Sequence, residues 1–342
     1  MYKNYTLGSL EKMSDEHDPR NYQFATLKAP QPVPAECMNM KTFLESIDAY
    51  RIAQNYGSCT SAGNKRSKDW QEKVLMSQHF LYVMTKKISQ IFDDEGDYPI
   101  NAQKAIYTYG ICEEKFMDSI NPGRNWKEYA TTEPSAEAYA NALTHKSRTF
   151  WEIKRNSLSE IKRAIGGFQT PVSVAMEWRT SYYDCPASGH LPLPSGAYEG
   201  GHNVAGVGYT DAAGNLWLGN SWGKSWGRAG QCFIPYTEFE AHGITSIFVN
   251  LDITKNMTYK INKETGEQFL IDETLKLALN ISNVAMLQRL QGRGLNEEPM
   301  DITAAELGNY LICPLTDRDS VASVIKEHYN ELADTIGAEK IK

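Results

Sequence analysis

Closely spaced cysteines are missing from this chain. Its six cysteines are scattered over 342 residues, at positions 37, 59, 112, 185, 232 and 313. So sparse a set does not form a disulfide scaffold, and without a CxxC pair neither a zinc ribbon nor a thioredoxin-like motif is expected. We predict no metal site and no cofactor. Five cysteines are interpreted as packing residues, with pairing among them left open: Cys37, Cys112, Cys185, Cys232 and Cys313.

Long apolar runs and an excess of positive charge are also missing. No run of 18 apolar residues occurs, and the first twenty residues contain no apolar signal-peptide core. We therefore expect no membrane association and a cytoplasmic location, although a protein carried in a virion would show the same features. Lys and Arg number 35 against 42 Asp and Glu, which argues against nucleic acid as a partner. The 41% hydrophobic content excludes disorder for most of the chain.

The composition changes along the chain and suggests three parts. Residues 1–37 end in alternating prolines and are predicted to form an extended strap. Residues 38–253 read as one α+β domain, with a helical lobe over about 38–150, including a helix over 69–92, and a β-rich lobe over about 151–253. Residues 254–342 are predicted to be helical, with helices over 269–290 and 319–336, and to cap the β-rich lobe, self-associate or bind a protein partner.

Cys59 stands in the turn Gly57-Ser58-Cys59, before a run of small residues that reads as a helix. A thiol at a helix N-terminus is favoured as the thiolate, which is the nucleophilic form. Taken alone, the pattern is explained better by a chance turn with a buried, inert thiol.

His202 and Asn220 belong to a second cluster, GGHNVAGVGY at 200–209 followed by LGNSWGKSWG at 218–227. The segment reads as strand, turn and strand, which returns Asn220 beside His202. An Asn side chain can accept a hydrogen bond from one imidazole nitrogen and fix the tautomer, leaving the other nitrogen to face a thiolate. Trp222 would shield that bond from water. Cys59 lies 143 residues before His202, and this ordered set is unlikely to arise by chance.

These motifs resemble the papain family of cysteine peptidases from roughly Tyr50 to Asn250, most specifically NSWGKSWGRAGQCFIPY at 220–236. That family has its Cys near the mature N-terminus and its His and Asn about 130–150 residues downstream. The resemblance implies a papain-like two-lobed fold with a cleft between the lobes. It also implies hydrolysis of a peptide or protein substrate by a Cys59 thiolate paired with imidazolium His202, oriented by Asn220, through a thioester acyl-enzyme.

The chain departs from the family pattern at several places. The family places a glutamine six residues before the nucleophile, where this chain has Ala53, and Gln54 stands five before. We expect Gln54 still to supply the second oxyanion donor beside the Cys59 N–H; otherwise that donor is missing. By alignment of the motifs, Ala175 and Asn203 would line the pocket for the residue two before the scissile bond. The usual inhibitory propeptide is expected to be absent or very short, because only 58 residues precede Cys59.

Two other functions remain open from the sequence. The first is a papain-like fold kept as a structural or binding module, for example in a phage particle or an assembly, with weak or no activity. It predicts that Cys59 and His202 lie far apart, or that residues 1–37 or the C-terminal segment fill the cleft. The second is a transpeptidase or isopeptidase that uses the same triad with a different acceptor.

Overall fold

The chain divides by its internal contacts into two units, one of residues 1–24 and 31–252 and the other of residues 25–30 and 253–342. The computed structural model describes residues 5–10, 24–26, 29, 32–120, 123–147, 149–251, 257–272, 277–280 and 300–314. Every described helix is too short or too polar to cross a membrane.

Helices dominate the first unit up to residue 144. They are α1 (Asn39–Ser46), α2 (Cys59–Glu72), α3 (Gln78–Ser89), α4 (Pro99–Tyr109), α5 (Trp126–Ala130) and α6 (Ala136–Thr144). The single helix predicted over 69–92 is wrong. The chain instead leaves α2 at Lys73, in the left-handed region with φ 58°, and begins α3 after Ser77, whose side chain accepts a hydrogen bond from the N–H of Phe80.

A seven-stranded sheet makes up the other side of this unit, in the order β2-β7-β3-β4-β5-β6 with β1 also paired to β4. Its strands are β1 (Glu36–Cys37), β2 (Thr149–Ile153), β3 (Val172–Arg179), β4 (Tyr198–Thr210), β5 (Asn215–Gly219), β6 (Gln231–Pro235) and β7 (Ile244–Leu251), and the short helix α7 (Leu158–Lys162) follows β2. All of the sheet's pairings are antiparallel.

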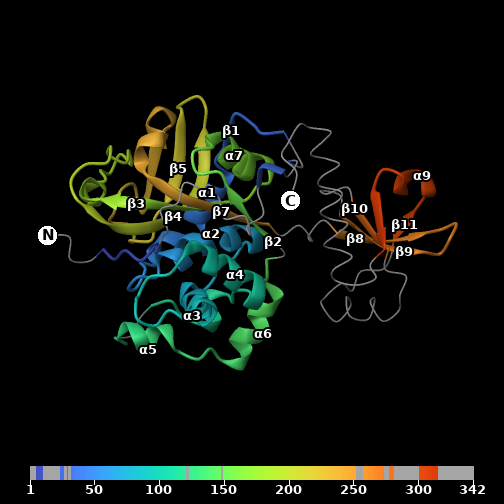
Figure 1. The fold of residues 1–342 in the computed structure, drawn as a ribbon, viewed down its shortest axis with the longest axis horizontal. Helices are drawn as coiled ribbons and strands as arrows, with labels where there is room; N and C mark the ends of the chain where they lie inside the picture. Colours follow the sequence, from blue (N-terminus) through green and yellow to red (C-terminus); the bar gives the residue numbers. More distant parts are fainter. Residues whose placement is uncertain are drawn as a thin grey trace. The chain divides into compact units, whose positions relative to one another are not determined.

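Helix α2 lies between the other helices and the sheet, and contacts both (Figure 1). Gly63 allows this approach, because a Cβ there would stand 1.9 Å from the Oδ1 atom of Asn203 on β4. A core of α3 and α4 side chains, including Phe80, Met84 and Ile106, supports α2 from one side. The start of α2 is therefore held against the middle of β4.

The described residues of the second unit form a sheet with one short helix, where the sequence predicted a helical extension. The order of the sheet is β11-β8-β9-β10-β12, from strands β8 (Met257–Asn262), β9 (Gln268–Asp272), β10 (Leu277–Asn280), β11 (Met300–Ile302) and β12 (Leu311–Pro314), with a short helix α9 (Ala304–Leu307).

The helix predicted over 269–290 is wrong where β9 and β10 occur. Phe269 and Ile271 are both buried, which is the two-residue period of a strand, and a turn at Gly266 (φ 72°) pairs β9 with β8. The remainder of that prediction, and the helix over 319–336, fall outside the described residues.

Candidate active site

Cys59 is the first residue of α2 and is fully buried. The turn before it is tight, because Ser58 Oγ donates to the carbonyl oxygen of Asn55 at 2.6 Å and Tyr56 has a left-handed φ of 53°. Gln78 on α3 donates in turn to Ser58 Oγ at 3.1 Å. This compact turn accommodates a spacing of five residues between Gln54 and Cys59.

His202 lies on β4 and meets Asn220 at the end of β5. Because β4 and β5 pair with Ala205 opposite Gly219, the residue after Gly219 returns beside His202. The Nε2 atom of His202 lies 2.7 Å from Asn220 Oδ1, and the ring of Trp222 lies 4.6 Å from the imidazole. The structure therefore brings His202, Asn220 and Trp222 together, as the sequence pattern predicts.

The start of α2 packs on β4 beside His202, where Gly63 of α2 contacts Asn203. A backbone hydrogen bond from Asn203, the residue after His202, acts to lower the pKa of the Cys59 thiol. The other imidazole nitrogen of His202, Nδ1, is buried and has no hydrogen-bond partner among the described residues. The cysteine and the histidine thus share one buried site between α2 and the sheet.

Burial sets the charge of this pair. It raises the pKa of the Cys59 thiol to about 12, against smaller opposing effects of backbone hydrogen bonds from Asn203 and Gly8. It lowers the pKa of His202 to about 4, although the hydrogen bond to Asn220 acts in the other direction. In this covered state the pair is therefore neutral, and the expected thiolate–imidazolium pair requires contact with water.

Gln54 directs its side-chain amide into the cleft. Its Oε1 atom accepts a hydrogen bond from Ser221 Oγ at 2.5 Å, and its backbone N–H donates to the Ser221 carbonyl at 2.6 Å. Its Nε2 atom donates to the carbonyl oxygen of Thr6 at 2.9 Å. Since Ser221 N also donates to Asn220 Oδ1 at 2.7 Å, one residue orients both Gln54 and Asn220.

The strap covers the site, through its residues 5–10. Gly8 and Ser9 both donate backbone hydrogen bonds to the carbonyl of Gly201, at 3.1 and 3.0 Å. Asp97 N donates to Gly8 O at 2.8 Å, Leu10 N donates to Asp97 O at 2.9 Å, and the bridge between Ser9 and Asp97 is parallel. The cleft is thus occupied by the chain's own backbone, and Cys59 and His202 have no exposed surface.

Asn203 makes contacts other than those of a pocket wall. Its side chain exchanges hydrogen bonds with Ser173, at 3.0 and 3.1 Å, and packs against Gly63 of α2. Ala175 pairs with Asn203 across β3 and β4 and is buried. A substrate-binding role for Asn203 and Ala175 stays a prediction.

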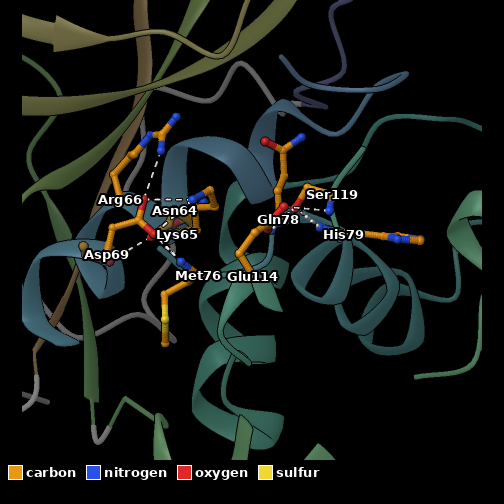
Figure 2. Close-up of polar contacts among 10 residues, drawn as sticks. Asn64, Lys65, Arg66, Asp69, Met76, Gln78, His79, Glu114 and Ser119 are labelled. Atoms are coloured by element: carbon orange, nitrogen blue, oxygen red, sulfur yellow. Dashed lines mark hydrogen bonds and ion pairs between the residues drawn. The ribbon is translucent and has the colours of Figure 1, made fainter. Parts of the chain in front are cut away.

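A buried ionic cluster at the far end of α2 was not recognised from the sequence (Figure 2). Asp69 bonds Lys65 Nζ at 2.8 and 3.0 Å and Arg66 Nη1 at 3.0 Å, with all three side chains buried. It also accepts from the backbone N–H of Met76 at 2.8 Å, so it fixes the loop between α2 and α3. The spacing of three and four residues within one helix was the available signal.

A second polar group in Figure 2 fixes the start of α3. Ser119 Oγ accepts from the backbone N–H of Gln78 at 2.9 Å and donates to Glu114 at 2.6 Å. His79 stacks on Tyr129 with ring centroids 3.7 Å apart, and its Nε2 atom lies 2.8 Å from the Tyr129 carbonyl oxygen. These contacts hold Gln78, and through it the turn before Cys59.

Comparisons with known proteins give the family of this chain. The model of the family described as papain family cysteine protease matches residues 49–249. An uncharacterized peptidase C1-like protein of Acanthamoeba polyphaga mimivirus is 26% identical over 252 residues, 70% of this chain and 76% of that protein.

Two solved structures show the same fold. Xylellain, a cysteine protease from Xylella fastidiosa, is 19% identical, with a TM-score of 0.55 over 72% of this chain and 96% of its own. A procathepsin B from Trypanosoma congolense is 15% identical, with a TM-score of 0.54 over 73% and 88%. The predicted α+β, papain-like fold is confirmed, and the chain belongs to the papain family of cysteine proteases.

Proposed function

We propose that this protein is a cysteine peptidase that hydrolyses peptide bonds through Cys59, and that residues 5–10 hold it latent. The observation that carries the proposal is the convergence of three groups on the start of α2. These are the His202–Asn220 pair at 2.7 Å, Cys59 where α2 packs on β4, and a Gln54 amide that already donates to a peptide carbonyl.

Each group has a defined role in this chemistry. In the open cleft the Cys59 thiolate attacks the carbonyl carbon of the substrate, while Gln54 Nε2 and the Cys59 N–H stabilise the oxyanion. His202 protonates the leaving amine as the C–N bond breaks and the thioester remains. Water then loses a proton to neutral His202 and attacks the thioester, which releases the acid and restores the Cys59 thiolate and the His202 imidazolium. Asn220 keeps the imidazole in one orientation throughout.

Latency follows from what residues 5–10 occupy. They bury the nucleophile, favour the neutral pair, and engage the Gln54 amide that a substrate carbonyl would need. Residues 5–10 are held by backbone hydrogen bonds, including a parallel bridge between Ser9 and Asp97. A segment bound mainly by backbone hydrogen bonds can leave without disrupting the core, so the block is reversible.

The test is peptide hydrolysis and labelling of Cys59 by an epoxide-type thiol inhibitor, before and after opening the cleft. One opened form lacks residues 1–10. The other is Gly8→Leu in the full chain, because even a Cβ at Gly8 would lie 2.2 Å from the carbonyl oxygen of Gly57. We expect both forms to gain both activities and Cys59→Ala in each background to lose them. If correctly folded opened forms show neither, the proposal is wrong.

A second function is favoured by one observation, the occupied cleft. A papain-like fold retained as a binding module, with weak or no activity, was expected to show its cleft filled by the N-terminal segment. The same experiment separates the two functions, because a binding module stays inactive after residues 1–10 are removed.

A further inference from the structure

Three aromatic rings stack at one end of the occupied cleft. Tyr5 lies on Trp222 with ring centroids 4.6 Å apart and planes 19° apart. Tyr183 also stacks with Trp222, at 5.5 Å and 13°, and lies 6.1 Å from Tyr5 with planes 9° apart. Of the three, only Tyr5 belongs to residues 5–10, the segment that covers the site.

The Trp222 ring and the turn that carries Tyr183 are both contacted by groups outside that segment. Trp222 is fixed edge-on by Trp178 at 4.8 Å and Trp226 at 5.7 Å. Tyr183 lies in the turn Thr180–Asp184, whose Tyr182 carbonyl accepts from Trp226 Nε1 at 3.1 Å. We therefore expect Trp222 and the turn of Tyr183 to stay in place when residues 5–10 leave the cleft.

Side chains next to this aromatic group also bind the backbone of the residue that follows Tyr5. Trp222 Nε1 donates to the carbonyl oxygen of Thr6 at 3.0 Å, and Gln54 Nε2 donates to that same oxygen at 2.9 Å. Tyr5 therefore directly precedes Thr6, whose carbonyl oxygen is bound by Gln54, the expected oxyanion donor. A substrate side chain placed here would stand within about two residues of the scissile bond.

We propose that Tyr183 and Trp222 form an aromatic subsite, which selects peptide substrates with an aromatic side chain beside the scissile bond and which Tyr5 fills in the latent chain. This inference rests on the proposed peptidase function. Stacked aromatic pairs favour such a substrate by up to about tenfold over an aliphatic one, beyond the gain from burying the ring. Tyr183 is the specificity-determining residue of the pair, since Trp222 also shields the His202–Asn220 bond.

The catalytic test uses the full chain opened by Gly8→Leu, with peptides that carry Tyr, Leu or Ala in turn at each position from three before to three after the scissile bond. We expect Tyr to be preferred at one position within two of that bond. Tyr183→Ala should lower kcat/KM about tenfold for the preferred peptide and leave the Ala peptide within twofold. Tyr183→Phe should retain the preference. Equal losses for both peptides, or no aromatic preference at all, would overturn the subsite.

A binding test does not depend on catalysis. The chain without residues 1–10 and with Cys59→Ala is titrated with a free peptide of residues 5–10, and with the same peptide carrying Ala in place of Tyr5. Tyr183→Ala should weaken binding of the first peptide about tenfold and of the second by less than twofold. If no peptide is cleaved but this difference holds, the peptidase function fails and the subsite stands. If cleavage occurs without the difference, only the subsite fails.

Discussion

Gln54 donates a hydrogen bond from its side-chain amide to the carbonyl oxygen of Thr6 at 2.9 Å. A peptide carbonyl of the chain itself therefore sits against the donor that a substrate would need in the transition state. The contact supports both parts of the proposal, because it shows that the amide reaches into the cleft and that the cleft is closed.

Replacing Gln54 should slow the opened enzyme. In the Gly8→Leu background we expect Gln54→Ala to lower kcat by about 100- to 1,000-fold, as removal of one oxyanion donor does elsewhere. Ser221→Ala removes the 2.5 Å bond that orients Gln54 and should have a smaller effect, about tenfold. Steady-state hydrolysis of a fluorogenic peptide measures both. An effect of Gln54→Ala below tenfold would mean that another group stabilises the oxyanion.

Removing the Thr6 hydroxyl should loosen the cover. Thr6 Oγ1 hydrogen-bonds the Tyr56 carbonyl and Gln54 Nε2 at 2.5 and 3.0 Å. Loss of these contacts in Thr6→Ala should raise the population of open molecules about tenfold, since each is worth roughly 0.5–1.5 kcal/mol net. The readout is the rate of Cys59 alkylation in the full chain. Thr131→Ala is the matched control, because that hydroxyl bonds only its own helix at Lys127, and it should leave the rate unchanged.

The pH dependence of alkylation distinguishes a gated thiol from one that is merely buried. The closed site holds a neutral thiol and imidazole, and opening converts them to thiolate and imidazolium without net uptake of protons. Opened and full chains should therefore share a plateau that extends below pH 7, with the full chain slower throughout. A full-chain rate that instead climbs about tenfold per pH unit into the alkaline range would mean that the covered thiol, its pKa raised to about 12, reacts directly.

The meeting of His202 and Asn220 was predictable because its signal is local. The run from His202 to Asn220 contains a strand, a turn and a strand, so hydrogen bonding between β4 and β5 returns Asn220 to His202. Gln54 stays a predicted oxyanion donor, chosen because a glutamine is unlikely to stand there by accident. The bond from Ser58 that closes the turn before Cys59 depends on atomic geometry, which the sequence does not show.

The occupied cleft was not predictable in the same way. Residues 5–10 bind through backbone atoms at Gly201 and Asp97, and backbone hydrogen bonds leave no trace in side-chain periodicity. The C-terminal sheet was missed for another reason. Leucines at 270, 275 and 279 suit a helical spacing, but β9 pairs with its chain neighbours β8 and β10, and pairing of β8 with β11 and of β10 with β12 joins strands distant in the sequence, which outweighs local propensity.

Stability should fall in acid through His242. Burial lowers its pKa to about 4, and its Nδ1 lies 2.9 Å from the Tyr182 hydroxyl. Below pH 6.5 the unfolded chain takes up a proton that the folded chain refuses, so folding weakens as the pH falls from 6.5 to 4. The loss from this residue approaches about 3 kcal/mol at pH 4. Urea unfolding measures the free energy of unfolding of His242→Gln and of the parent between pH 6.5 and 4. We expect it to fall less steeply for His242→Gln; an equal fall in both would mean that His242 is not responsible.

The buried carboxylate of Asp69 should matter far more for stability than an exposed one. Asp69→Ala leaves Lys65 and Arg66 without their anion inside the core, which costs about 3–5 kcal/mol in the free energy of unfolding. Burial lowers the pKa of Lys65 to about 8 although Asp69 raises it, so in the variant the Lys65 pKa falls further and release of its proton relieves part of that cost. Glu133→Ala is the control, since its pairing with Lys87 at 2.9 Å is exposed and contributes about 0–1 kcal/mol. Urea denaturation that finds equal losses for the two variants would mean that the cluster contributes no more than a surface ion pair.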